Sequence, residues 1–113
     1  MARIVVASAD LQVRARVDRA AGAVATFTAP TGFAEKLPGA GLLVLDLDAG
    51  GQAAIDEAAV YAGTADGPSR VIGFYSHIDD DLKRAAQAAG IEAYPRGRFW
   101  RDLPSLLGVS DPS

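Results

Sequence analysis

The sequence predicts a single α/β domain in which helices cover both faces of a five-stranded parallel sheet. Short apolar runs alternate along the chain with segments whose apolar residues recur at helical spacing. The strongest run, residues 42–45, is continuously apolar, which is typical of a strand buried on both faces. With 113 residues, the chain has the usual length of one domain with one core.

The first strand is predicted at residues 4–7 and the second at residues 23–27. Between them, Asp10 is a suitable N-cap for a helix that ends at Gly22. The apolar residues of this helix share one face: Val13, Val17, Ala20 and Ala21. Residues 33–37 form at most a short helix, so the second helix of the domain is expected to be stunted.

Three further strands are predicted at residues 42–45, 71–75 and 93–94. The helices that follow them are predicted at residues 52–62, from the acidic run 79–81 to Gly90, and at residues 99–107, where Pro104 fits only in a first turn. Residues 1–108 are expected to form the domain and residues 109–113 a flexible tail.

Composition excludes several classes of site. The chain has no cysteine, so it offers neither a disulfide nor a thiolate for metal binding or catalysis. Neither a leader peptide nor an apolar segment of about 20 residues is seen, so a cytoplasmic protein without membrane contact is expected. The net charge is −3, yet six arginines cluster in two segments: Arg14, Arg16, Arg19, Arg96, Arg98 and Arg101.

The ends of the predicted strands carry the most specific residues. Asp46 ends the third strand within the segment 43–51, and Ser76 ends the fourth strand 30 residues later. Together with the segment 88–94, these residues resemble the response-regulator receiver (CheY-like) family. The resemblance implies a flavodoxin-like, three-layer fold with strand order 2-1-3-4-5. It places Asp46 at the phosphoacceptor position, Ser76 at the switch Ser/Thr position and Tyr94 at the aromatic residue that changes rotamer on activation.

Two positions depart from the family pattern. Where receivers have adjacent acids after the first strand, this chain has Ala7 and Ser8, which supply no carboxylate to Mg²⁺. A count without gaps puts Gly97 at the position of the family's lysine, whereas a shift of one residue puts Arg96 or Arg98 there. Arg96 and Gly97 would point in opposite directions on a strand, and the sequence does not decide between them.

A degenerate phosphoacceptor pocket is therefore expected, without a bound metal, cofactor or catalytic residue. Its members are Ser8, Asp46, Asp48 and Ser76. Asp46 and Asp48 would face one cation if strand alternation continued past Asp46, but solvated acids in a loop are the simpler interpretation. His77 lacks the partners of a catalytic triad, and the acidic run 79–81 lacks calcium-loop spacing.

The segment 94–101 mixes arginines with aromatic residues, a combination enriched in binding hot spots. The residues expected to bind a partner are Tyr94, Arg96, Arg98 and Trp100. The first and last helices cover the same face of this kind of sheet, so Arg14, Arg16 and Arg19 would extend the basic surface. The leading hypothesis is a non-catalytic pseudo-receiver, a regulatory module in signal transduction that contacts a protein partner or forms a homodimer.

Two alternatives stay open. In the first, the chain is a phosphorylated stand-alone receiver in which Asp10 or Asp48 replaces the missing acids beside Asp46. In the second, the clustered arginines bind a small anion or nucleic acid, although the acidity of the whole chain argues against nucleic acid.

Overall fold

The computed structural model describes residues 3–61, 64 and 67–108. Its five strands are β1 (Arg3–Ala7), β2 (Ala25–Thr28), β3 (Ala40–Asp46), β4 (Arg70–Tyr75) and β5 (Glu92–Pro95). All neighbouring pairs are parallel, and the strands lie in the order β2-β1-β3-β4-β5. The predicted fold class and strand order are therefore confirmed. Residues 109–113, the predicted tail, lie outside the described residues.

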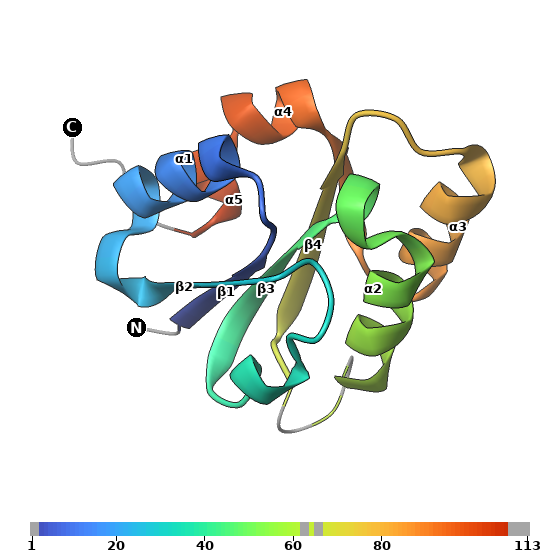
Figure 1. Cartoon of the computed structure of the whole chain (residues 1–113), viewed down its shortest axis with the longest axis horizontal. Helices are drawn as coiled ribbons and strands as arrows, with labels where there is room; N and C mark the ends of the chain where they lie inside the picture. Colours follow the sequence, from blue (N-terminus) through green and yellow to red (C-terminus); the bar gives the residue numbers. More distant parts are fainter. Residues whose placement is uncertain (1–2, 62–63, 65–66, 109–113) are drawn as a thin grey trace.

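Helices cover both faces of the sheet (Figure 1). One face is covered by α1 (Leu11–Ala21), α4 (Arg96–Arg101) and α5 (Leu103–Leu106), and the other by α2 (Leu47–Tyr61) and α3 (Asp80–Ala88). The strands β1, β3 and β4 send side chains into two separate cores on opposite faces of the sheet, as the two-residue period of a strand requires. The three-layer arrangement follows from this double burial. No helix in the described ranges is long and apolar enough to cross a bilayer.

The stunted second helix is a single turn of 3-10 helix, η2 (Ala34–Lys36). The buried side chains of Phe33 and Leu37 flank this turn and fill the core that a longer helix would otherwise cover. The Glu57 carboxylate on α2 accepts the backbone N–H groups of Gly32 and Ala34 at 2.7 and 2.8 Å. These bonds fix the loop to α2 without a regular helix.

Helix caps match the sequence prediction, but some boundaries differ. Asp10 and Asp79 cap α1 and α3 through side-chain bonds to backbone N–H groups. Another 3-10 turn, η1 (Gly22–Val24), occupies the predicted start of the second strand, which therefore begins two residues later. The predicted helix 99–107 was wrong as one element.

The last helical segment consists of α4 and α5, which are separated at Asp102. Pro104 lies in the first turn of α5, where its missing N–H costs no helical hydrogen bond. α4 begins at Arg96, directly after β5. Because Arg96 is the first residue of α4, the alternation of side chains along β5 does not extend to it.

Candidate functional site

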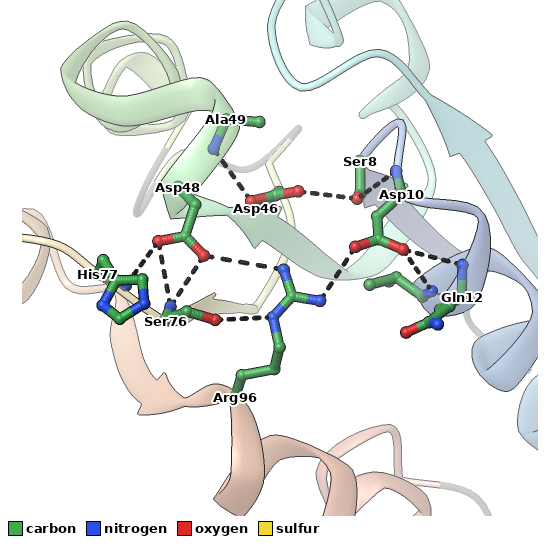
Figure 2. A network of polar contacts seen from close by, with 10 residues as sticks. Ser8, Asp10, Gln12, Asp46, Asp48, Ala49, Ser76, His77 and Arg96 are labelled. Carbon is green, nitrogen blue, oxygen red and sulfur yellow. Dashed lines mark hydrogen bonds and ion pairs between the residues drawn. The ribbon is translucent and has the colours of Figure 1, made fainter.

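A network of polar side chains lies at the carboxyl ends of four strands (Figure 2). Ser8 follows β1, Asp46 ends β3, Ser76 follows β4 and Arg96 follows β5. Ligands of doubly wound sheets bind at this edge, so the topology brings these residues to the place where chemistry is expected. The four residues predicted for the pocket, Ser8, Asp46, Asp48 and Ser76, all belong to the network.

Asp46 lies at the base of the site and is only 4% exposed. One carboxylate oxygen accepts the hydroxyl of the fully buried Ser8 at 3.0 Å, and the other accepts the N–H of Ala49 at 3.1 Å. The Ser8 oxygen in turn accepts the N–H of Asp10 at 3.1 Å. The phosphoacceptor position thus holds a buried carboxylate with a partner on each oxygen.

Asp48 does not share the surroundings of Asp46. β3 ends at Asp46 and Asp48 lies in the first turn of α2, so strand alternation no longer applies between them. The Asp48 carboxylate accepts the N–H of Ser76 at 2.8 Å and that of His77 at 3.0 Å. Asp48 therefore holds the start of the loop that leads to α3, and the two carboxylates have separate partners.

Arg96 spans the site. Its Nε donates to the Ser76 hydroxyl at 3.0 Å, its Nη1 donates to Asp10 at 3.0 Å, and its Nη2 lies 3.7 Å from Asp48. The Arg96 side chain is 25% exposed, whereas open space surrounds the position where a side chain on Gly97 would begin. Of the residues left open for the lysine position, Arg96 is the one whose side chain enters the site.

The receiver resemblance implies a magnesium ion beside Asp46, and the donor set does not fit one. β1 leads into Ala7 and Ser8, which contribute no negative charge. The carboxylates of Asp10 and Asp48 already pair with the guanidinium. Across the residues that the structure describes, no three acidic or histidine side chains are grouped for metal binding. A divalent cation would have to compete with a resident positive charge.

The partners of Asp10 in the network lower the pKa of its carboxyl group. Partial burial acts to raise its pKa, but hydrogen bonds from Arg96 and from the N–H groups of Gln12 and Val13 outweigh it and hold the pKa below the ordinary value of 3.8. An acid with a lowered folded pKa stabilises the fold above its unfolded pKa. That stabilisation is lost as the pH falls through the folded value.

We therefore expect Asp10→Asn to lower the free energy of unfolding by about 0.5–1 kcal/mol at pH 7, a range that allows for solvent screening. Asparagine keeps a capping oxygen but loses the charge, so the difference from the native chain should shrink below about pH 3.5. Urea unfolding at both pH values measures it. A difference that is equal at the two pH values would contradict the assigned ion pair.

The four residues predicted for partner binding, Tyr94, Arg96, Arg98 and Trp100, make contacts of different kinds. Arg96 belongs to the pocket. The Arg98 guanidinium lies 5.1 Å from the centre of the Tyr94 ring, and the Tyr94 hydroxyl donates to Glu92 at 3.0 Å. The Trp100 ring lies 4.5 Å from the Arg16 guanidinium of α1 and 5.9 Å from that of Arg96.

The role of Arg14 differs from the sequence prediction. Its guanidinium donates to the carbonyl oxygens of Ser8 at 2.8 Å and Thr28 at 3.4 Å, so it is used within the fold. Arg16 is the α1 arginine whose guanidinium lies over the Trp100 ring of α4. Because α1 and α4 cover the same face of the sheet, a contact between them was expected, but no local sequence pattern distinguished Arg16 from Arg14.

Neither the family models nor the curated proteins contain a match to this sequence. Among solved structures, the chain is similar to the crystal structure of a response regulator receiver protein from Burkholderia phymatum. The sequences are 27% identical, the likeness covers 100% of each chain, and the TM-score is 0.66. Together with the strand order and the polar site at the strand ends, this full-length likeness supports a CheY-like receiver with the flavodoxin-like fold.

Proposed function

We propose that this receiver domain is a pseudo-receiver, a non-catalytic module of signal transduction that works through protein contacts and does not take a phosphoryl group at Asp46. The observation that carries the proposal is the position of Arg96. Its guanidinium bridges Asp10, Asp48 and Ser76, where a phosphorylated receiver would need room for a cation and a phosphoryl group.

Charge balance supports this proposal. Phosphoryl transfer requires positive charge that neutralises the phosphoryl oxygens and is free to rearrange during the reaction. Here the positive charge of Arg96 is used by two carboxylates, and the Ser8 hydroxyl is neutral. Each Asp46 oxygen also accepts a hydrogen bond, from Ser8 or Ala49, which lowers its reactivity as a nucleophile toward phosphorus.

The direct test is incubation with acetyl phosphate and MgCl₂, followed by phosphate-affinity electrophoresis and intact mass measurement. We expect no phosphorylated species from the native chain and the same result for Asp46→Ala. A receiver with a complete acidic pair serves as the positive control. A shifted band in the native chain that disappears in Asp46→Ala would refute the proposal.

A second readout uses Trp100, the single tryptophan of the chain. Its ring lies 5.9 Å from the Arg96 guanidinium, so displacement of the arginine should change its emission. We expect MgCl₂ to leave the emission of the native chain unchanged. A saturable change that Asp46→Ala removes would indicate a working cation site and would favour a rebuilt receiver.

A further inference from the structure

A clamp of side chains holds Tyr94, the aromatic residue that the receiver resemblance places at the position of the rotamer change. The Tyr94 hydroxyl donates to the Glu92 carboxylate at 3.0 Å, and the same carboxylate accepts Arg70 Nε and Nη2 at 2.6 and 2.8 Å. Arg70, the first residue of β4, also donates to the Leu106 carbonyl of α5 at 3.4 Å. The Tyr94 hydroxyl is thereby connected to β4, β5 and α5.

This clamp directs Tyr94 away from Ser76. Residues two apart on a strand point to the same face, so the bond to Glu92 directs the Tyr94 hydroxyl toward the amino end of β5. Ser76 follows the opposite, carboxyl end of β4. The Arg98 guanidinium of α4 lies 5.1 Å from the centre of the Tyr94 ring and 3.6 Å from Asp102, so a second side chain also holds the ring.

The ion pair beneath Tyr94 has a geometry that fixes orientation. Two parallel hydrogen bonds join the Arg70 guanidinium to Glu92, which restricts both side chains more than a single bond would. The bonds from Arg70 hold the pKa of the Glu92 carboxyl below its ordinary value of 4.5, so an ionised acceptor faces Tyr94 at neutral pH. Both side chains are 41% exposed, so solvent screens the pair, and its main effect is to position Tyr94.

A second clamp holds Ser76 (Figure 2). Arg96 Nε donates to the Ser76 hydroxyl at 3.0 Å, and Asp48 accepts the Ser76 N–H at 2.8 Å. The Arg96 guanidinium is itself held over aromatic rings, at 5.1 Å from the centre of the Phe74 ring and 5.9 Å from that of Trp100. Movement of Ser76 would therefore break bonds from both its hydroxyl and its backbone.

We propose that these two clamps form a conformational lock. Ser76 stays on Arg96 and Tyr94 stays on Glu92, so the two positions at which a receiver changes state keep one arrangement. The inference rests on the proposed function, since a locked module has no second state through which to report phosphorylation of Asp46. It also specifies how the module acts: every molecule presents the same surface to a partner, and the output depends on the concentration of the chain.

The test of the first clamp is carbon-13 relaxation dispersion on the whole chain, with tyrosine labelled at the ring carbon that bears the hydroxyl. This carbon lies on the ring axis, so ring flips do not contribute. The chain has three tyrosines, and Tyr94→Phe assigns the signal of Tyr94. We expect this signal to show no exchange on the microsecond to millisecond timescale in the native chain.

Glu92→Ala removes the acceptor of the Tyr94 hydroxyl and the partner of Arg70. It should introduce exchange at Tyr94, with a second conformer populated above about 1%. Glu35→Ala is the matched control, because it removes an exposed glutamate from η2 and should leave the Tyr94 signal unchanged. Circular dichroism verifies that each variant is folded.

The second clamp is tested by amide hydrogen exchange. Arg96→Ala should speed the exchange of the Ser76 and His77 N–H groups at least about tenfold, because the loop that contains them loses its bond to the arginine. Arg84→Ala, which removes an exposed arginine from α3, should change these rates by less than about twofold.

Exchange at Tyr94 in the native chain would overturn the lock. So would a Glu92→Ala variant without exchange at Tyr94, or unchanged amide rates in Arg96→Ala. These measurements report on Tyr94 and Ser76, whereas the phosphorylation assay reports on Asp46. An unphosphorylated chain with exchange at Tyr94 would overturn the lock alone, and a phosphorylated chain with a fixed Tyr94 would overturn only the proposed function.

Discussion

Phe99→Ala is expected to lower the free energy of unfolding by about 3–5 kcal/mol, the usual cost of a cavity left by a buried phenylalanine. Phe99 is fully buried between α4 and the sheet. Its ring stacks on that of Phe74, with ring centres 4.8 Å apart, and packs against Trp100. Its neighbours on strands and on other helices cannot all move to fill the space.

Urea unfolding followed by circular dichroism measures this loss. Val60→Ala is the matched control, because Val60 is an exposed apolar side chain on α2 and its truncation should change the free energy by less than about 0.5 kcal/mol. Trp100 emission should shift to longer wavelength in Phe99→Ala, since the ring loses its buried neighbour. A loss below about 1 kcal/mol would show that α4 is not anchored as described.

Phe99 also shows what the sequence predicted well. Within the predicted helix 99–107, the apolar residues Phe99, Leu103, Leu106 and Leu107 recur at helical spacing, and all four are buried. The same period failed to show that Asp102 separates two helices, because the buried face continues across the break. The spacing of apolar residues indicates which side chains are buried, but it does not show whether the backbone continues as one helix.

The start of α2 illustrates a second limit. Adjacent glycines disfavour a helix, so the prediction began it at residue 52, yet the helical segment begins at Leu47. Gly51 does interrupt it, with φ at 54°, a left-handed conformation that glycine adopts readily. Gly50 is required by packing, since a Cβ there would lie 2.6 Å from that of Ala54.

The network of the site could be predicted only in part. The sequence identified the strand-end residues because topology places the ends of parallel strands together. It could not pair them: Arg96 and Asp10 are 86 residues apart, and the helix that begins at Arg96 removes the alternation that might have chosen between Arg96 and Gly97. The Arg96 guanidinium reaches both Asp10 and Asp48, so the pairing depends on the segments that follow β1, β3 and β5 together.

The second large effect is expected from Ser8→Asp. The Ser8 hydroxyl lies 3.0 Å from a carboxylate oxygen of Asp46, and both residues are buried. The substitution would therefore replace a hydrogen-bond donor by a second negative charge. Two carboxylates at this separation cannot both ionise without a cost, so the free energy of unfolding at pH 7 should fall by about 2–4 kcal/mol.

Ser8→Asn is the matched control, because asparagine has nearly the shape of aspartate without its charge. The pair of acids in Ser8→Asp would bind a proton more tightly when folded than when unfolded, so its pKa is raised and its cost is present above that pKa. The difference in stability between Ser8→Asn and Ser8→Asp should therefore shrink as the pH falls from 7 toward about 4.

Magnesium tests the proposed absence of a cation site beside Asp46. In Ser8→Asp, two adjacent carboxylates provide the negative charge that a divalent cation needs, so millimolar MgCl₂ should recover part of the lost stability. The native chain and Ser8→Asn should not respond, because a neutral side chain faces Asp46 in both. If MgCl₂ stabilises the native chain as much as Ser8→Asp, the proposed lack of a cation site beside Asp46 is wrong.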